Sequence, residues 1–528
     1  MIGPAVLAAS DAIRTERLRT GVLGVLLAAL AIGLGILGGV LTVRDHAFAV
    51  VLVAGLFVPI LFWRVPVSPI LLFVLGATAV DRFPDASADN LLAKIPLWRS
   101  LAQDYGISGA ILFPVEMLIG LAVTVWLARA ISRRQLRLQP SQLGVGIALV
   151  LLMALVAEAL GLARGGVFNI SLWEVRPFVY LALTYVLTSQ LVTKRAELDA
   201  VLWGLVLGTA YKGLLGTERL ITLGNVFPRP EAILEHDESF FFSCYIVLTA
   251  GLWLFGKRGP LRWAAAALLP LVVTADLGNN RRAAWVILPA VLIALGLVLY
   301  VRTPARRKLI AWIMGVLLVA CSAYMVVFRN SQSLVGEPAH AVWSQFQPDP
   351  RDASSNLYRV LENQNLAIDI KEAVFTGTGF GVPVAHPIPL YDASSFDPLI
   401  NFIPHNNVLY VWLRMGSLGM IIFWWMIGAA VVAACRLARR PDRTLGLFGV
   451  MALTAVIAWV FQGWLDVGIV SFRIVVIVGC LLGGVAAARR LAEERAAGDL
   501  EAIEEPVAAV KVVPLRPSEP AAASLATL

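Results

Sequence analysis

A succession of apolar segments, each long enough to cross a lipid bilayer, constrains this chain more than any other feature. A membrane-spanning helix needs about 20 predominantly apolar residues, and about fourteen such segments follow one another with short polar breaks between them. The sequence therefore predicts an all-α fold, a polytopic transmembrane helical bundle of about 12–14 spans. The predicted spans lie near residues 21–43, 47–63, 67–82, 109–131, 143–162, 177–193, 198–216, 239–256, 262–276, 284–301, 310–328, 407–434, 444–464 and 470–487.

The charge distribution separates this chain from soluble and nucleic-acid-binding proteins. Of its 528 residues, 59% are hydrophobic and 15% are charged, whereas soluble domains average about 45–50% apolar and 25% charged residues. The net charge of +8 comes from short clusters of Lys and Arg between apolar segments, which indicates membrane topology and not a nucleic-acid surface. The four cysteines lack the CxxC spacing of metal sites, and we expect neither a metal nor another cofactor.

Clusters of basic residues occur on alternate connections between the predicted spans. Lys and Arg are retained on the cytoplasmic side of a membrane, so both termini are expected in the cytoplasm and the opposite connections on the periplasmic or outer side. A short interfacial helix is predicted at residues 5–20, and the span that follows is too long for the core of a signal peptide. The basic clusters are Arg133 to Arg137, Lys194 and Arg195, Lys257 and Arg258, Arg302 to Lys308, Arg436 to Arg443, and Arg489 and Arg490.

Four regions follow from this topology. Residues 1–328 hold the interfacial helix and the first eleven spans, and residues 405–490 hold the last three. Between them lies a long periplasmic loop, residues 329–404, and loops of this length usually carry function or helices of their own. Residues 491–528 are rich in Ala, Glu and Pro, a composition that predicts a disordered cytoplasmic tail.

Within the long loop we expect short helices. Ser354 or Ser355 can cap a helix that runs toward Val374, where glycines end it.

Three arginines are predicted at the outer ends of spans. Arg176 opens the sixth span, and Arg281 and Arg282 begin the tenth within DLGNNRRAAW. Charged residues in hydrocarbon cost a few kcal/mol and usually line a cavity, and a planar guanidinium donates paired hydrogen bonds to a diphosphate at any working pH. The set therefore indicates a phosphate ligand. For each arginine taken alone, anchoring of a helix end to lipid headgroups is the alternative.

His405 begins the twelfth predicted span, at the depth of those arginines. A nearby helix N-terminus should lower the pKa of its imidazole and favour the neutral form, which a general base needs. That form suits deprotonation of a sugar hydroxyl. The alternative is that His405 only belongs to the cap region of the span, where Asn406 or Asn407 provides the capping side chain.

Two further groups of residues have open interpretations. The segment GTGFGVP, with Gly377 and Gly379, resembles a phosphate-binding loop but lacks the GxGxxG spacing and its strand and helix context. A tight turn that returns the loop to the membrane is favoured, with backbone N–H groups near the ligand. Glu116, Glu158 and Lys212 are predicted inside spans, where they form either a proton or ion path or polar contacts between helices.

Three segments, in this order, resemble the O-antigen ligase and polymerase superfamily of bacterial envelope proteins. NRRAAW is similar to the family's sequence of a small polar residue, an arginine and two small residues at the same place. ASSNLYRVLENQNLAI followed by VFTGTGFGVP resembles the family's large external loop, and PHNNVLYVWLRMGSLG resembles its H-N-x-x-L-x(6)-G-x-x-G signature. The resemblance covers residues 170–434.

This resemblance implies a C-type glycosyltransferase-like fold and a metal-independent glycosyltransferase. The implied reaction transfers or polymerises an oligosaccharide from an undecaprenyl diphosphate carrier, with lipid A core or a growing glycan as acceptor, on the periplasmic face of the bacterial inner membrane. The implied partners also include membrane lipids, a flippase and a chain-length regulator, but no nucleic acid.

The family's functional residues map onto matching positions of this chain. His405 takes the position of the catalytic base, Arg282 that of the diphosphate-binding arginine, and Arg176 that of a second arginine at the start of an earlier span. Arg281 and Arg359 are added as diphosphate contacts. Supporting contacts are expected from Asn406, Arg414, Gly377 and Gly379.

Two departures from the family and two other functions remain open. Arg414 stands where the family often has an acidic residue, and Arg281 replaces a small polar residue, so both either contact an anionic glycan or lipid or alter the site. A transporter of a small solute or ion would use the charged residues inside the spans, but its site is expected near the membrane midplane, whereas the polar groups gather at the outer side. A structural partner in a polysaccharide assembly would make His405 dispensable.

Overall fold

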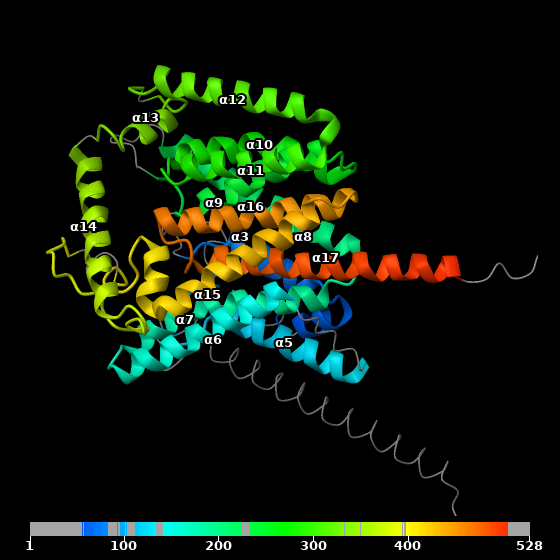
Figure 1. Ribbon diagram of the computed structural model, residues 1–528, viewed down its shortest axis with the longest axis horizontal. Helices are drawn as coiled ribbons and strands as arrows, with labels where there is room; N and C mark the ends of the chain where they lie inside the picture. The colour runs from blue at the N-terminus through cyan, green and yellow to red at the C-terminus, as the bar shows by residue number, and fades with distance from the viewer. Residues whose placement is uncertain are drawn as a thin grey trace, which may run out of the picture.

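The computed structural model of the protein is a bundle of long helices (Figure 1). It describes residues 55, 57–82, 92, 95–100, 102, 111–133, 141–223, 232–331, 333–348, 350–392, 394 and 398–504, which form helices and turns and contain no strand. Among these residues, ten helices are long and apolar enough to cross a membrane, or eleven spans if a bent pair counts as one. The predicted all-α, polytopic transmembrane fold is thereby confirmed.

The helices follow the order of the predicted spans. The first half of the bundle consists of α3 (Ser68–Ala79), α5 (Pro114–Arg133), α6 (Gln142–Ala163), α7 (Phe168–Leu191), α8 (Arg195–Leu223), α9 (Glu238–Leu254) and α10 (Pro260–Asn279). The second half consists of α11 (Ala284–Arg302), the short 3-10 helix η2 (Pro304–Arg306), α12 (Arg307–Val327), α13 (Glu337–Trp343), α14 (Pro350–Glu372), α15 (Asn407–Ala438), α16 (Arg443–Leu465) and α17 (Phe472–Glu504).

The structure corrects the prediction of two separate spans at 47–63 and 67–82. In the described residues, the helices Phe57–Arg64 and Ser68–Ala79 form one pair, bent by 119° at the break between them. Pro66 lies in that break, and proline cannot continue a helix because it lacks the N–H donor. The predicted interfacial helix at 5–20 and the first span at 21–43 lie outside the described residues.

Three other predicted boundaries are wrong. α7 begins at Phe168 and not near residue 177, so its polar first turns belong to the helix. α14 begins at Pro350, ahead of the expected caps Ser354 and Ser355, because proline is favoured at the first helical position, where its missing N–H costs nothing.

The third boundary concerns the predicted disordered tail. α17 continues to Glu504 without interruption, so residues 491–504 extend the helix, which is consistent with the good helix propensity of their Ala, Glu and Arg residues. Residues 505–528 lie outside the described residues.

The centre of the bundle is the long contact between α7 and α17. Small residues let the two backbones approach: a Cβ on Gly479 would lie 2.0 Å from Oγ1 of Thr184, and one on Gly483 would lie 2.4 Å from the carbonyl oxygen of Tyr185. Close approach of this kind is a common way for helices to associate in membranes, where apolar side chains gain little from leaving lipid. The glycines of α17 therefore set the position of α7 relative to the rest of the bundle.

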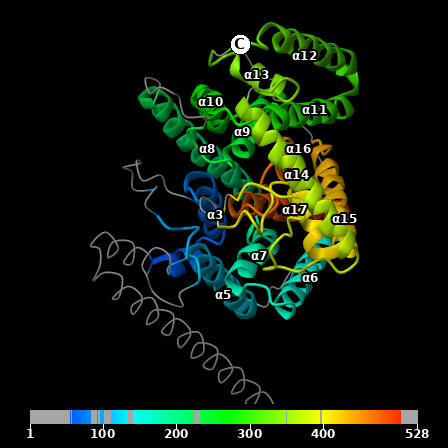
Figure 2. The ribbon, with the colours of Figure 1, turned by 90° about the vertical axis from the view of Figure 1, so that its left-hand side faces the viewer.

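The long connection between α12 and α15 contains α13 and α14, and α14 crosses the ends of the bundle helices (Figures 1 and 2). We call this the α14 end of the bundle. The N-terminus of α15 and the turn between α10 and α11 contact α14, and the C-terminal end of α16 lies under it.

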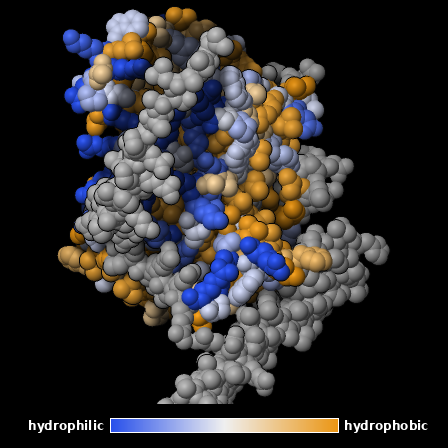
Figure 3. All heavy atoms as spheres, turned by 90° about the vertical axis from the view of Figure 1, so that its right-hand side faces the viewer, coloured by the Kyte–Doolittle hydropathy of each residue, from blue (hydrophilic) through white to orange (hydrophobic). Residues whose placement is uncertain are grey.

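The basic connections gather at the opposite end. Arg195, the first residue of α8, pairs with Asp442 before α16 at 2.6 Å. Arg302 at the end of α11 donates to the carbonyl of Ala438 at 2.6 Å. Figure 3 views the molecule from this side and shows hydrophilic residues on the end face and hydrophobic residues along its flanks. This arrangement suits a bundle whose sides contact lipid and whose ends contact water.

Candidate functional site

One face of α14 carries the polar side chains that contact the α14 end of the bundle. Residues at spacings of three or four lie on the same side of a helix, and the stripe consists of Asp352, Asn356, Arg359, Glu362 and Asn363. The first two contact Arg282, Arg359 contacts the end of α16, Glu362 contacts His405, and Asn363 contacts Asn406. α14 thus brings Arg282, Arg359 and His405, three of the predicted site residues, to one surface.

His405 lies directly before α15 and faces Glu362 of α14. Its Nδ1 is 3.1 Å from Oε1 and 3.3 Å from Oε2 of Glu362, and its backbone N–H donates to Oε2 at 3.2 Å. The ring of Tyr358 contacts the imidazole edge-on. The side chain of His405 keeps 26% of its surface exposed, whereas that of Glu362 keeps 5%. The imidazole is therefore held from one side and accessible from the other.

The electrostatic environment of His405 corrects the sequence-based expectation of a lowered pKa. Burial alone lowers the pKa of this imidazole, but the hydrogen bond and the charge of Glu362, together with the charge of Asp466, outweigh it and raise the pKa above the ordinary value. Arg359 opposes part of that increase. The error arose because the sequence shows the helix N-terminus beside His405 but not the carboxylate brought in by α14.

Asn406 provides the N-cap of α15. Its side-chain oxygen accepts a hydrogen bond from the N–H of Leu409 at 3.2 Å, and its Nδ2 donates to Oδ1 of Asn363 at 3.1 Å. Because Asn406 caps the helix, the imidazole of His405 is not needed for capping.

The turn between α10 and α11 directs two adjacent arginines to different partners. α10 ends at a left-handed residue with φ of 43°. Beyond it, Arg282 donates from Nη1 to Asn356 at 2.9 Å and from Nη2 to Asp352 at 3.0 Å. Arg281 donates from Nη2 to the carbonyl of Leu234 at 3.2 Å. The side chain of Arg282 keeps 33% of its surface exposed, so this guanidinium can reach a ligand at the surface below α14.

Sequence reasoning missed His236 and Asp466, which lie beside this group. Nδ1 of His236 is 2.5 Å from Oδ2 of Asp466, and Arg359 donates to the carbonyl of Leu465, one residue before. Burial alone raises the pKa of Asp466, but the charge and hydrogen bond of His236, with the charges of Arg359 and His405, hold it well below its usual range. Asp466 is thus a fixed negative charge between two histidines and an arginine.

Arg176 does not join this surface, contrary to its predicted place at the opening of a span. It lies inside α7, where Nε pairs with Glu116 at 2.7 Å and Nη2 donates to the carbonyl of Ile111 at 2.7 Å. Its guanidinium lies 4.0 Å from the ring centre of Phe113, and Tyr180 donates to the same carboxylate at 3.0 Å. These contacts tie α7 to the start of α5, and none of them involves α14.

Arg414 makes buried contacts within the protein and does not reach the surface where a ligand could bind. Its side chain and that of Glu174 are fully buried, and its Nε lies 2.8 Å from Oε1 of Glu174. The remaining donors bind Oγ1 of Thr378 at 3.0 Å and the carbonyls of Gly379 at 3.1 Å and Phe402 at 2.8 Å. With these donors used internally, the expected contact of Arg414 with an anionic glycan or lipid does not fit the geometry.

The glycine-rich segment forms a tight turn against α15 and α6. Gly377 and Gly379 have φ of 69° and 81°, and a Cβ on Gly379 would lie 2.3 Å from the backbone nitrogen of Gly161. The N–H groups of Thr378, Gly379 and Phe380 donate to carbonyls of α15 and α6 at 2.7, 3.2 and 3.1 Å. These N–H groups therefore hold the turn in place, and the expectation that they face a phosphate is wrong.

Glu116, Glu158 and Lys212, which the sequence places inside spans, each contact another side chain. Glu158 accepts a hydrogen bond from Ser171 at 2.7 Å, and the fully buried Lys212 forms an ion pair with Asp81. Glu116 pairs with Arg176, as described above. These local contacts, two ion pairs and one hydrogen bond, favour polar contacts between helices over a continuous ion path.

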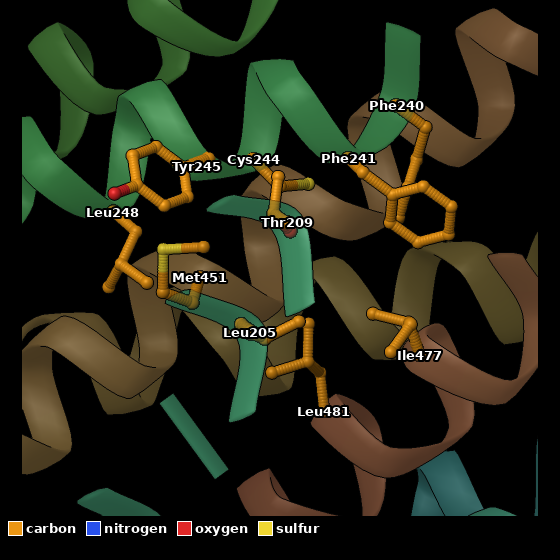
Figure 4. A pocket seen from close by; sticks show the side chains of 10 residues that line it. All are labelled: Leu205, Thr209, Phe240, Phe241, Cys244, Tyr245, Leu248, Met451, Ile477 and Leu481. Atoms are coloured by element: carbon orange, nitrogen blue, oxygen red, sulfur yellow. The ribbon is translucent and has the colours of Figure 1, made fainter. Parts of the chain in front are cut away.

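A small apolar cavity lies between α8, α9, α16 and α17 (Figure 4). Leu205, Cys244 and Ile477 are among the residues that line it, and none of the predicted site residues does. This cavity is not the candidate site. Within the described part of the chain, no three His, Cys, Asp or Glu side chains are grouped so that they could hold a metal ion.

Comparison with known proteins agrees with the resemblance found in the sequence. Residues 266–424 match the O-antigen ligase family model, and this range contains Arg281, Arg282, all of α14 and His405 but not Arg176. None of the curated proteins compared with the chain matches it. The family match confirms the resemblance to the O-antigen ligase and polymerase superfamily and supports a membrane enzyme of O-antigen ligase type.

Proposed function

We propose that this protein is a membrane glycosyltransferase that transfers or polymerises an undecaprenyl-diphosphate-linked oligosaccharide on the periplasmic face of the bacterial inner membrane. The acceptor is lipid A core in a ligase or a growing glycan in a polymerase. The observation that carries the proposal is that α14 joins His405, an accessible imidazole, to Arg282 and Arg359 at one end of the bundle. All three residues lie within the O-antigen ligase match.

The spacing of these residues along α14 suits an extended donor headgroup. Arg282 contacts α14 at residues 352 and 356, and His405 contacts it at residue 362. With a rise of about 1.5 Å per residue, the contacts are about 9–15 Å apart along the helix. Arg359 lies between these contacts along α14. A diphosphate bound at Arg282 would therefore place the first sugar of the donor toward His405.

The proposed reaction needs one base and one cluster of positive charge. Nε2 of His405 accepts the proton of the acceptor hydroxyl while that oxygen attacks C1 of the donor sugar. The bond from C1 to the diphosphate oxygen breaks, and its electron pair leaves with undecaprenyl diphosphate. Arg282, assisted by Arg359 and Arg281, neutralises the charge that develops on the leaving diphosphate, which is the task that a metal ion performs in other phosphate chemistry.

The proposed orientation places α14 in the periplasm and both termini in the cytoplasm. The basic connections at the end opposite α14 support it, because Lys and Arg are retained in the cytoplasm. The oligosaccharide donor would then reach the site from the outer leaflet, after a flippase has delivered it, and a chain-length regulator would act with the enzyme if it is a polymerase.

Reconstitution with a defined donor tests the proposal. The full-length protein, His405→Ala and Arg282→Ala are incubated with an undecaprenyl diphosphate oligosaccharide, candidate acceptors and a metal chelator. Arg489→Ala is the matched control, because it removes an exposed arginine at the opposite end. We expect transfer by the wild type and by Arg489→Ala, and a loss of about a hundredfold or more in the two site variants.

Either of two results contradicts the proposal. If no variant consumes the donor with any acceptor, the enzyme assignment fails, and solute transport through the buried charged residues becomes the function to assay. If His405→Ala transfers as fast as the wild type, His405 is not the base.

A further inference from the structure

The contact between Glu362 and His405 has a geometry that goes beyond a simple ion pair. Both carboxylate oxygens of Glu362 face Nδ1, at 3.1 and 3.3 Å, and one of them also accepts the backbone N–H of His405 at 3.2 Å. One side chain of α14 thus fixes the backbone and the ring of the same residue. Glu362 itself is 3% exposed, so water does not compete for its oxygens.

This arrangement determines which ring nitrogen is the base. A carboxylate that faces Nδ1 accepts the proton there, so the neutral imidazole carries its lone pair on Nε2. The described residues offer Nε2 no hydrogen bond, and the ring keeps its exposed surface. The same carboxylate stabilises the imidazolium that forms once Nε2 has taken a proton, as a carboxylate does in His-containing catalytic triads.

We propose that Glu362 is the positioning residue of the transfer reaction: its carboxylate keeps the proton on Nδ1 of His405 and directs Nε2 to the acceptor hydroxyl. This inference rests on the proposed role of His405 as base. It adds a residue on a different element, and it makes docking of α14 a condition for a correctly prepared base.

Other charged groups also face His405, and their signs support the assignment. Arg359 of α14 opposes the protonated form, and Asp466 at the end of α16, itself bound to His236, favours it. Glu362 is the group in direct contact with the ring. Removing its charge while keeping its shape should therefore change the protonation of His405 more than any other single substitution.

The alternative is that Glu362 has only a structural role and holds α14 against the start of α15. A neighbouring residue of α14 offers a control for that structural role. Asn363 is the next residue of α14, and its Oδ1 accepts a hydrogen bond from Nδ2 of Asn406 at 3.1 Å. This hydrogen bond is thus with the neighbour of His405 and not with the imidazole. Asn363→Ala thus removes a neighbouring hydrogen bond between α14 and the start of α15. Glu362→Gln keeps an acceptor oxygen and removes the charge.

The first measurement needs no donor. Full-length wild type, Glu362→Gln and Asn363→Ala are treated with diethyl pyrocarbonate, which acylates neutral imidazole, over a range of pH, and the His405 peptide is quantified by mass spectrometry. We expect half-maximal labelling of the wild type above about pH 6.5, the ordinary histidine value. The pH of half-maximal labelling should be lower in Glu362→Gln than in the wild type, and it should be unchanged in Asn363→Ala. A wild-type midpoint at or below the ordinary value overturns the proposal even if Glu362→Gln does not fold, as does an equal midpoint in both proteins.

The second measurement is the pH dependence of glycan transfer. In Glu362→Gln we expect kcat to fall by up to about a hundredfold, the low end of a general base contribution, and the acidic limb of kcat/KM to move to lower pH. Asn363→Ala should not change the pH of the acidic limb of kcat/KM. An unmoved limb in Glu362→Gln overturns the positioning role. Activity of His405→Ala would instead overturn the proposed function, and the labelling result would separate the two failures.

Discussion

Glu174 and Arg414 form a buried ion pair that links α7, α15 and the glycine-rich turn. Neither side chain has exposed surface. Besides Arg414, the carboxylate of Glu174 accepts hydrogen bonds from Tyr410 at 3.1 Å and from the N–H of Gly381. A buried pair adds little net stability compared with apolar residues of the same size, but removal of one partner leaves a buried charge without compensation.

We therefore predict that Glu174→Ala destabilises the protein by about 3–5 kcal/mol, whereas the double variant Glu174→Ala, Arg414→Met recovers most of that loss. The unfolding midpoint in detergent, measured by heating, compares the three proteins. Equal stability of Glu174→Ala and the wild type would show that the pair does not hold the turn.

At the scale of elements, α14 behaves as a cover over the site. Its polar face contacts the α10–α11 turn, the end of α16 and the start of α15. Asp352 forms an ion pair with Arg282 at 3.0 Å, and the proposed function places the donor diphosphate at the same guanidinium. In the proposed reaction, the diphosphate of the donor then has to displace the carboxylate of Asp352 from Arg282.

This exchange predicts the effect of Asp352→Asn. Without the carboxylate, the diphosphate no longer displaces a charged partner, so KM for the donor should fall by up to about fivefold, the factor of an ion pair of about 1 kcal/mol. kcat should change less. The measurement is the initial rate of transfer against donor concentration.

Asp369→Asn is the matched control for this prediction. It removes the same charge from the same helix, but Asp369 accepts the N–H of Ala385 at 2.8 Å and lies away from Arg282. An unchanged or higher donor KM in Asp352→Asn alone, or an equal decrease in both variants, would exclude a direct exchange at Arg282.

At the scale of the whole molecule, the two ends of the bundle differ in chemistry. The α14 end carries carboxylates, histidines and arginines in contact with one another, whereas the opposite end carries basic connections joined to carbonyls and to Asp442. The protein is multi-pass, so these ends face opposite sides of the membrane.

Cysteine labelling tests which end faces the periplasm. In a variant without the four native cysteines, Tyr391→Cys lies in the long loop, where the tyrosine is 72% exposed, and Arg489→Cys lies at the opposite end, where the side chain is 61% exposed. A membrane-impermeant maleimide should label only Tyr391→Cys in spheroplasts and only Arg489→Cys in inside-out vesicles. The reverse pattern would place α14 in the cytoplasm.

Local properties of the sequence predicted the helices of the bundle well. The length of an apolar segment and the capping side chain at its start act over one or two turns, so the sequence predicted the span at α15 with Asn406 or Asn407 as its cap. The structure shows that Asn406 is the cap. The order of the motifs likewise made His405 and Arg282 candidates, because each lies just before a helix within a recognisable pattern. The bent pair near Pro66 and the helical start of the tail show where apolar length and composition alone give the wrong boundary.

Contacts between distant segments could not be predicted in this way. Glu362 lies 43 residues before His405 and Glu174 lies 240 residues before Arg414, and nothing in the sequence near either residue indicates its partner. Only helix packing decides which charges are paired, buried or accessible. It therefore decides that Arg176 and Arg414 make internal contacts, whereas Arg282 and His405 both contact α14. The sequence by itself determined a membrane bundle with one long connection between its spans, because hydrophobic burial in lipid depends on apolar length. The tertiary structure decided the electrostatics of the site, because Coulomb interactions and hydrogen bonds depend on distance in space.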